Sequence, residues 1–346
     1  MGFPKFDTVI DKLKNARLLF FPFGILYGWL MAIRNKLFDS GILVSENPTI
    51  KSIGLGNLAM GGTGKSVVVM HLIKMLKDHR VATLSRGYGR KTRGLIIAGP
   101  EDTPATLGDE PYQFFNRYPK TFVVVSEKRT LGIKALEKMA TPPDWVVLDD
   151  VMQHRWVRPH LMIMTSSFQQ PYFRDFVFPA GKLREFSSGV KRADILLITR
   201  APQDLSLGQK NEFLKKINLN IPVFFTKIRY ADVLTQQDNT IDKSVLSDED
   251  FLLVTGIADS HHLVTYLKKQ YGKFDHLEFK DHHPYSHADA KMINERAGNK
   301  LILTTEKDYA KLEQTLNNDR LYCLTIELDF VFEEEQDLFE RMITEV

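Results

Sequence analysis

The feature that most constrains the fold is a strand, a glycine-rich turn and a helix that follow one another directly. The apolar run IKSIGLG covers residues 50–56, GGTGKS follows at 61–66, and VVVMHLIKML continues from there. Glycines let the backbone N–H groups of such a turn point at one anion, and the next helix begins with its positive end toward it. The segment therefore predicts a phosphate-binding loop in an α/β fold.

Two side chains of this loop suit phosphoryl chemistry. Lys65 offers a point charge to the transferring phosphate, and the Ser66 hydroxyl can bind Mg²⁺. The strict Walker pattern has a glycine where Ala59 stands, so we expect Gly54 and Gly56 to leave room for a variant loop. A glycine turn that binds no phosphate is the competing interpretation. The residues expected to bind the nucleotide are Gly61, Gly62, Thr63, Gly64, Lys65 and Ser66.

Short apolar runs alternate with helix-compatible stretches from residue 50 to about 200, which predicts a mostly parallel sheet flanked by helices. Expected strands cover 50–55, 81–84, 95–98, 122–125, 145–148, 161–165 and 195–199. Beyond a polar stretch with one strand candidate, 223–228, further strands are expected at 251–255, 301–304 and 321–326, with helices at 260–271, 286–296 and 306–316. We predict a P-loop NTPase-like core at 46–205 and a C-terminal portion, 206–346, that includes a second, smaller α/β lobe.

The N-terminal segment has a membrane-like composition. Residues 18–33, LLFFPFGILYGWLMAI, carry no charge. Basic residues flank the run, namely Lys12, Lys14, Arg17, Arg34 and Lys36. The run is shorter than the roughly 20 apolar residues of a spanning helix, and Pro22 and Gly24 interrupt it. Basic flanks suit anionic headgroups, and Trp and Tyr suit the interface, so residues 1–45 are expected to form a helical segment at a membrane surface. A buried core helix is the alternative.

Charge and cysteine content narrow the class of protein. The chain has 46 basic and 43 acidic residues, a balance that does not indicate a nucleic-acid partner. Cys323 is the only cysteine, which excludes an internal disulfide and fits a reducing compartment. No cysteine–histidine cluster has zinc spacing, and no feature indicates an obligate protein partner.

Paired acids follow one of the expected strands. Asp149 and Asp150 come directly after the strand at 145–148, where a Walker B motif holds Mg²⁺. A solvated turn is the competing interpretation. Gln153 and His154 follow closely and could line the same crevice.

Two glycine-containing loops offer arginines, whose planar fork matches phosphate oxygens. Arg86 lies in SRGYGR, and Arg184 lies beside Glu185 in FPAGKLREF. Either loop alone could be a basic surface turn.

Two other turns carry acids and histidine. Asp109 opens a predicted helix, where an acid is favoured as a cap. Asp281 and His282 precede a proline and read as a polar turn. Phosphoryl transfer to an alcohol, however, needs a base within reach of the attacking hydroxyl, and an Asp–His pair can supply one.

Taken in order, the motifs GNLAMGGTGKS, SRGYGRK, GDEP, LDDVMQHR, FPAGKLRE, DHHPY and TTEKDYAKL resemble the tetraacyldisaccharide 4'-kinase family, the lipid A 4'-kinases of Gram-negative bacteria. The resemblance implies transfer of the γ-phosphate of ATP, with Mg²⁺, to the 4'-hydroxyl of a tetraacylated disaccharide 1-phosphate. It further implies a P-loop core with a second lobe and a peripheral or monotopic location on the cytoplasmic face of the inner membrane, where lipid IVA would be formed for lipopolysaccharide.

The same resemblance implies roles for matching residues. Lys65 and Ser66 become phosphate and Mg²⁺ contacts, and Asp109 pairs with His282 as the base. The further active-site groups would be Asp149, Asp150, Gln153, Arg184 and Glu185. Val151 and Met152 depart from the family's glycine and aromatic residue, so the turn geometry beside the metal is expected to differ.

Two other classes of protein share parts of this pattern. A P-loop switch NTPase of the metal-insertase or ParA-like kind would act on protein partners, but it usually has a lysine where Met60 stands. A membrane-attached scaffold would retain an inactive nucleotide site. Of these three classes of protein, only the kinase needs a lipid acceptor.

Overall fold

The computed structural model describes residues 19–236 and 239–346, which belong to two compact units. The P-loop unit comprises Met1–Arg86, Ser126–Ile228 and Leu328–Val346, and the second unit comprises Gly87–Val125 and Arg229–Glu327. The units interleave along the chain, because it passes between them in β8 (Val223–Gln236) and β13 (Leu321–Phe330), among other places. They therefore differ from the consecutive ranges 1–45, 46–205 and 206–346 expected from the sequence.

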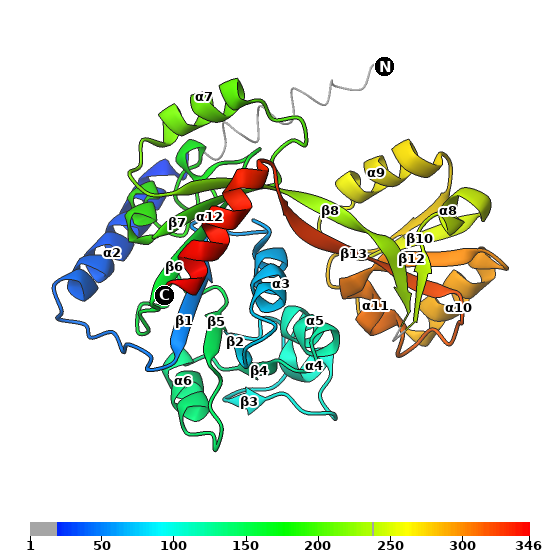
Figure 1. Cartoon of the computed structure of the whole chain (residues 1–346), viewed down its shortest axis with the longest axis horizontal. Helices are drawn as coiled ribbons and strands as arrows, with labels where there is room; N and C mark the ends of the chain where they lie inside the picture. The colour runs from blue at the N-terminus through cyan, green and yellow to red at the C-terminus, as the bar shows by residue number, and fades with distance from the viewer. Residues whose placement is uncertain (1–18, 237–238) are drawn as a thin grey trace. The chain divides into compact units, whose positions relative to one another are not determined.

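A parallel sheet forms the centre of the P-loop unit (Figure 1). Its strands besides β8 are β1 (Lys51–Gly56), β2 (Val81–Ser85), β5 (Trp145–Leu148), β6 (Leu161–Ser167) and β7 (Ile195–Thr199). They pair in the order β2-β5-β1-β6-β7-β8, and each pairing is parallel. In β1, β2, β5, β6 and β7 nearly every residue is buried, as expected of a sheet covered on both faces, whereas β8 is buried mainly at residues 224–226.

Helices cover both faces of this sheet. They are α3 (Lys65–Met75), α6 (Arg129–Glu137), α7 (Leu207–Ile217) and α12 (Glu333–Thr344). Adjacent residues of β8 contact opposite layers: the ring of Phe225 lies 5.6 Å from that of Phe213 in α7, and the ring of Phe224 lies 5.5 Å from that of Phe339 in α12. This alternation follows the period of two along a strand and gives three layers.

Helix α2 (Phe21–Asp39) also belongs to the P-loop unit. Pro22 lies in the first turn of α2, where backbone N–H groups have no partner within the helix. The proline therefore does not interrupt the helix, which continues through Gly24. A Cβ on Gly24 would lie 2.8 Å from the Val177 carbonyl oxygen, and one on Gly28 2.5 Å from the Phe186 ring, so both glycines permit close packing. No helix in the described part of the chain is long and apolar enough to cross a membrane. The predicted flanking residues Lys12, Lys14 and Arg17 lie outside the described residues.

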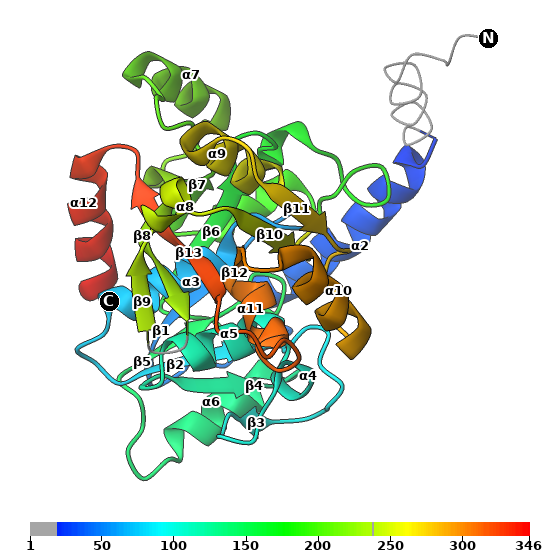
Figure 2. The ribbon, with the colours of Figure 1, turned by 90° about the vertical axis from the view of Figure 1, so that its right-hand side faces the viewer.

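The second unit has its own parallel sheet, in the order β11-β10-β12-β13. The strands besides β13 are β10 (Phe251–Thr255), β11 (Asp275–Glu278) and β12 (Leu301–Thr305). The helices are α9 (His261–Tyr271) on one face and α10 (His287–Ala297) and α11 (Glu306–Leu312) on the other (Figure 2). Leu253 packs toward α9 and Leu252 toward α10 and α11, which again reflects the strand period.

Smaller elements complete the described residues. In the second unit they are β3 (Ile96–Ile97), α4 (Pro104–Leu107), α5 (Asp109–Arg117), β4 (Phe122–Val125), β9 (Asn239–Asp242) and α8 (Val245–Asp248). In the P-loop unit they are the 3-10 helices η1 (Tyr172–Arg174) and η2 (Ser187–Arg192). Strands β3 and β4 pair antiparallel, as do β8 and β9.

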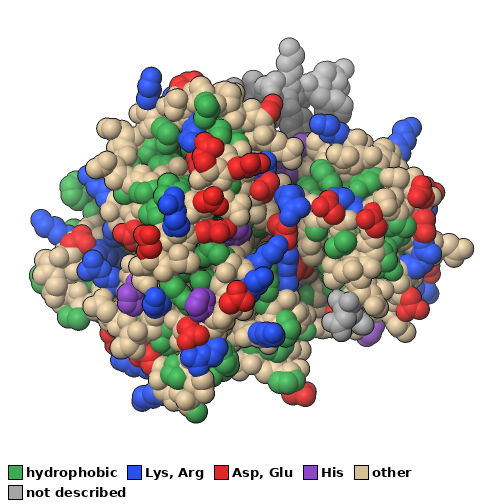
Figure 3. All heavy atoms as spheres, viewed as in Figure 1, with side chains coloured by type: hydrophobic (Ala, Val, Ile, Leu, Met, Phe, Trp, Pro, Cys, Tyr) green, Lys and Arg blue, Asp and Glu red, His purple; other side chains and the backbone are tan. Residues whose placement is uncertain are grey.

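Lys and Arg side chains are interspersed with Asp and Glu over the face shown in Figure 3. This distribution agrees with the small net charge of +3. The charged residues that bear on function are therefore better identified by their individual contacts.

Candidate active site

The glycine-rich loop adopts a backbone that requires glycine. Gly61 has φ 106° and Gly64 has φ 78°, both in the left-handed region that a side chain disfavours. Lys65 is the first residue of α3, so the loop lies at the positive end of a buried helix. The strand, turn and helix predicted from the sequence are confirmed.

Asn57 holds this loop from within, which the sequence did not predict. Its fully buried side chain donates hydrogen bonds through Nδ2 to the Ala59 carbonyl oxygen at 2.7 Å and to Thr63 Oγ1 at 2.9 Å. Thr199 Oγ1, at the end of β7, donates to the Thr63 carbonyl oxygen at 2.9 Å. Side-chain hydrogen bonds thus fix the loop where the usual first glycine is absent.

The role expected of Gly54 and Gly56 is wrong. Both lie within β1, and they make room for the turn after β5 rather than for the phosphate loop. A Cβ on Gly54 would lie 2.9 Å from Val151 Cγ1, and one on Gly56 would lie 2.4 Å from Met152 Cβ. Val151 and Met152 are buried, so this departure from the family pattern is accommodated by packing.

Asp150 lies between two cations at the loop. Lys65 Nζ is 3.4 Å from Asp150 Oδ1, and Arg184 Nη1 donates to Asp150 Oδ2 at 2.9 Å. Burial alone would raise the pKa of the Asp150 carboxyl, but Lys65 and Arg184 outweigh burial and hold that pKa below its ordinary value. Asp150 also has φ 50°, a strained backbone of the kind found at functional sites.

A hydrogen-bonded network continues from this cluster to α2. Arg184 Nη1 donates to Gln153 Oε1 at 3.1 Å, and Gln153 Nε2 donates to Glu185 Oε1 at 3.0 Å. Asn35 Nδ2 of α2 donates to Glu185 Oε2 at 2.7 Å. The Arg184 amide also donates to the Leu58 carbonyl oxygen at 2.7 Å, so the loop that carries Arg184 pairs directly with the phosphate loop.

Basic groups also gather near the turn after β5. Burial and the charges of Arg129, Arg34 and Arg86 lower the pKa of His154 to about 4, so its imidazole is neutral at pH 7. Arg129 Nη2 donates to the Asp149 carbonyl oxygen at 3.2 Å, and burial lowers the pKa of its guanidinium to about 10. A concentration of positive charge suits an anionic ligand.

In the second unit, Asp109 and His282 are in contact. His282 Nδ1 lies 2.6 Å from Asp109 Oδ2, and Lys311 Nζ of α11 lies 2.7 Å from the same oxygen. Burial alone would raise the pKa of the Asp109 carboxyl, but the hydrogen bonds from Lys311 and His282 outweigh burial and lower it. The carboxylate is therefore ionised and oriented toward the imidazole.

The loop that carries His282 is fixed by buried hydrogen bonds. His282 has φ 59°, and its amide donates to the Gly256 carbonyl oxygen at 3.1 Å. The fully buried Asp308 accepts hydrogen bonds from the Gly256 amide at 2.9 Å and from Thr305 Oγ1 at 2.7 Å. Lys307 Nζ lies 3.3 Å from His282 Nε2 and 3.4 Å from Asp281 Oδ1. The strained backbone and fixed loop indicate a functional imidazole.

Comparison with known proteins identifies the family. Residues 16–346 match the model of the LpxK family, tetraacyldisaccharide-1-P 4'-kinase. The chain belongs to this family. A tetraacyldisaccharide 4'-kinase from Flavobacterium psychrophilum is 38% identical over 94% of this chain and 96% of its own length. Another from Flavobacterium johnsoniae is 40% identical over 91% of this chain and 93% of its own length.

A solved structure agrees with these relatives. LpxK from Aquifex aeolicus in complex with ATP has a TM-score of 0.78 and 28% identity, covering 95% of this chain and 99% of that chain. The chain is thus a kinase of lipid A biosynthesis, and the switch NTPase is the weaker interpretation. The predicted α/β fold, with a mostly parallel sheet flanked by helices, is confirmed.

The predicted residues of this kinase are divided between the two units. The P-loop unit holds Lys65, Ser66, Asp149, Asp150, Gln153, His154, Arg184, Glu185 and Arg86, and the second unit holds Asp109, Asp281 and His282. Side-chain contacts join Lys65, Asp150, Arg184, Gln153 and Glu185 in the first and Asp109, Asp281 and His282 in the second. Sequence reasoning did not single out Arg129, Lys307 or Lys311. The four-residue spacing of the two lysines, which places them on one helix face, is a signal that could have found them.

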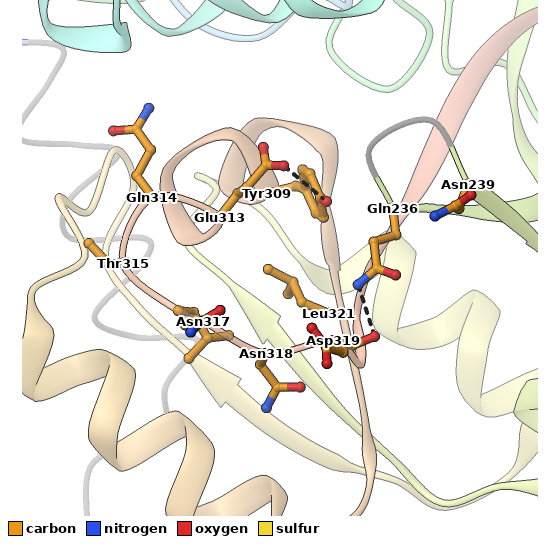
Figure 4. A pocket seen from close by; sticks show the side chains of 11 residues that line it. Gln236, Asn239, Tyr309, Glu313, Gln314, Thr315, Asn317, Asn318, Asp319 and Leu321 are labelled. Carbon is orange, nitrogen blue, oxygen red and sulfur yellow. Dashed lines mark hydrogen bonds between the residues drawn. The ribbon is translucent and has the colours of Figure 1, made fainter.

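A pocket of about 480 Å³ in the second unit is separate in its lining from these clusters. It is surrounded mainly by amides, acids and one tyrosine, and the neighbouring side chains of Tyr309 and Glu313 form a hydrogen bond in its lining (Figure 4). No residue predicted for the active site lines this pocket.

Metal binding in this kinase would need few protein ligands. The described residues contain no group of three or more His, Cys, Asp or Glu side chains arranged around a metal site. Mg²⁺ commonly uses one or two carboxylates together with water and substrate phosphates, so the donor set of Ser66, Asp149 and Asp150 fits it.

Proposed function

We propose that this kinase transfers the γ-phosphate of ATP to the 4'-hydroxyl of a tetraacyldisaccharide 1-phosphate, forming lipid IVA, with His282 as the base. The observation that carries the proposal is the 2.6 Å contact between His282 Nδ1 and Asp109 Oδ2. A phosphate loop alone is compatible with many NTPases, whereas an oriented imidazole suits an alcohol acceptor.

The phosphate loop supplies the donor side of the reaction. Backbone N–H groups of residues 61–66 would bind the phosphates of ATP, and the Lys65 ammonium would bind the transferring group. Ser66, Asp149 and Asp150 would hold Mg²⁺, which supplies charge neutralisation on the phosphates when bound. Asp150 already pairs with Lys65 and Arg184, so this acid is kept ionised for a cation.

The Asp–His pair supplies the acceptor side. With Asp109 accepting a hydrogen bond from Nδ1–H, the lone pair of His282 lies on Nε2, which would take the proton of the 4'-hydroxyl. Lys307 Nζ lies 3.3 Å from that nitrogen, so the acceptor hydroxyl would replace the lysine as its partner. Lys311 holds Asp109 ionised and acts as a positioning residue.

Helix α2 is proposed to place the kinase on the cytoplasmic face of the inner membrane as a peripheral protein. Large apolar side chains are exposed on this helix and on the two residues before it: Leu19, Phe20, Phe21, Phe23, Ile25, Leu26, Tyr27, Trp29, Leu30 and Ile33. Phe176 and Phe178, both about half exposed, pack edge-on against Phe21 and Tyr27 and extend this surface. An apolar surface of this size marks an interaction site, and an acylated substrate resides in a membrane.

The test is incubation with γ-labelled ATP, Mg²⁺ and a detergent-dispersed tetraacyldisaccharide 1-phosphate, followed by chromatography of the lipid. We expect labelled lipid that disappears when the acceptor lacks its 4'-hydroxyl. Label released as phosphate without any lipid product would contradict the proposal.

Lys65→Ala tests the phosphate loop in the same assay. Turnover should fall by orders of magnitude, because the charge acts on the transferring group. Turnover within about threefold of the unmodified protein would show that the loop is not where phosphate is transferred.

A further inference from the structure

Arg200 is an arginine beside the phosphate loop that no part of the proposed mechanism uses. It directly follows β7 and is partly buried. Its Nε is buried without a hydrogen-bond partner, and its guanidinium makes no hydrogen bond or ion pair with any described residue. A partly buried guanidinium without partners carries an unmet cost, which a ligand can remove.

The backbone of Arg200 is held in an unfavourable conformation by contacts on both sides. Its φ is 55°, in the left-handed region that side chains disfavour. Before it, Thr199 Oγ1 donates to the Thr63 carbonyl oxygen at 2.9 Å; after it, the Ala201 amide donates to the Thr226 carbonyl oxygen at 2.9 Å. Strained backbone of this kind clusters at functional and ligand-binding sites.

The Arg200 side chain lies near the phosphate loop. A Cβ placed on Gly62 would lie 3.4 Å from Arg200 Nη2, so the guanidinium lies beside the loop at a glycine. Arg200 therefore borders the site in which the proposed function places the nucleotide phosphates.

The sheet order decides which part of the nucleotide Arg200 meets. Strand β5 pairs with β1 on one side, and β6 followed by β7 lies on the other. Asp150 follows β5 and pairs with Lys65, so the transferring phosphate belongs on the β5 side. The nucleoside end must then extend toward the β7 side, where Arg200 lies.

We propose that Arg200 binds the adenosine portion of ATP, with its guanidinium plane stacked on the adenine ring. This inference rests on the proposed function, because it places the nucleotide phosphates in the loop. A guanidinium is planar and weakly hydrated, and it stacks on aromatic faces more readily than an ammonium does. Arg200 is thus a binding residue for the base, not for the phosphates.

Titration calorimetry of the full-length protein with ATP, ADP and inorganic tripolyphosphate, each with Mg²⁺, tests the proposal. Arg200→Ala should weaken the binding of ATP and of ADP by roughly tenfold and change the affinity for tripolyphosphate by less than about twofold. Arg200→Lys keeps the positive charge but lacks the planar guanidinium group, so its affinities should resemble those of Arg200→Ala. Arg158→Ala, at an exposed arginine ahead of β6, is the matched control and should bind as the unmodified protein does.

The remaining outcomes separate the inference from the proposed function. Equal weakening of tripolyphosphate binding and ATP binding would assign Arg200 to the phosphates and overturn the stacking. Unchanged ATP binding in an Arg200 variant with an unchanged melting temperature would also overturn the stacking. Binding of ATP without phosphorylation of the lipid acceptor would overturn the proposed function and leave the Arg200 contact standing. Absence of ATP binding in the unmodified protein would overturn both.

Discussion

The Asp109–His282 contact joins residues that are 173 positions apart, and it depends on His282 keeping a left-handed backbone. We propose that the pair acts as a unit in which the carboxylate orients the imidazole. Asp109→Asn and His282→Ala should each lower turnover by roughly a hundredfold with little change in ATP affinity. The double variant should be scarcely worse than the poorer single variant.

Steady-state kinetics with the lipid acceptor check this prediction. His261→Ala, at an exposed histidine of α9, is the control and should leave turnover unchanged. Multiplicative losses in the double variant would indicate two independent residues rather than a base and its partner.

His154 gives the folded protein a pH dependence whose sign follows from its environment. Its pKa is lowered to about 4 in the folded protein, whereas an unfolded histidine titrates near 6.5. Between these values the unfolded chain binds the proton and the folded protein does not, so the free energy of unfolding falls as the pH is lowered. After allowance for partial exposure, the loss is on the order of 1–2 kcal/mol.

Urea unfolding at pH 7 and at pH 5 measures this effect. His154→Gln stays neutral and should show a smaller loss of stability between the two pH values than the unmodified protein. An identical loss in the two proteins would mean that His154 is protonated in the folded state.

At the scale of elements, α2 depends on its glycines for contact with the loop at 176–186. Gly28→Val would place a Cβ 2.5 Å from the Phe186 ring, so the ring or the helix would have to move. We expect a loss of about 1–3 kcal/mol, because overpacking forces the neighbouring ring or the helix to move. Lower activity is expected as well, since α2 also bonds to Glu185.

Thermal unfolding measures the stability of this variant. Gly208→Ala in α7 is the matched control, since a Cβ there would meet only Ser206 Oγ, at 3.8 Å, and alanine favours a helix. Equal melting temperatures for Gly28→Val and the unmodified protein would show that α2 is not held by this packing.

Elements with continuous apolar runs were predictable, and the others were not. Runs such as WVVL at β5 and FLLVT at β10 match their predicted strands, because burial on both faces leaves no ambiguity. The short polar strand β11, DHLE, gave no such signal. The helix expected at 306–316 ends at Leu312, within a stretch whose composition is compatible with a longer helix.

The site was predictable only where neighbours in sequence are neighbours in space. The loop residues 61–66 and the paired Asp149 and Asp150 fall in this class. The partner of Asp109 could be named only through the family resemblance, since no spacing relates it to His282. Lys311 and Arg200 escaped notice because their importance lies in distant contacts.

At the scale of the whole molecule, membrane attachment should depend on the exposed side of α2 and not on its packed side. Leu26 and Leu30 are 61% and 59% exposed and one turn apart. Changing both to Glu should release the protein from vesicles of anionic phospholipid, because it removes apolar burial and adds repulsion. ATP binding should survive.

Vesicle flotation measures this attachment. Leu207→Glu, at an α7 residue 60% exposed, is the matched control and should float with the vesicles as the unmodified protein does. If the α2 variant floats equally well, another surface holds the protein to lipid.

The interleaving of the two units has a consequence for synthesis on the ribosome. The P-loop unit is completed by Leu328–Val346, where α12 packs Phe339 against Phe224. That stretch emerges from the ribosome only after the whole second unit. The P-loop unit therefore cannot finish folding before the second unit is made, contrary to the usual N-terminal-first order of cotranslational folding. Neither unit can therefore be released as a separate fragment by a single cut in the gene.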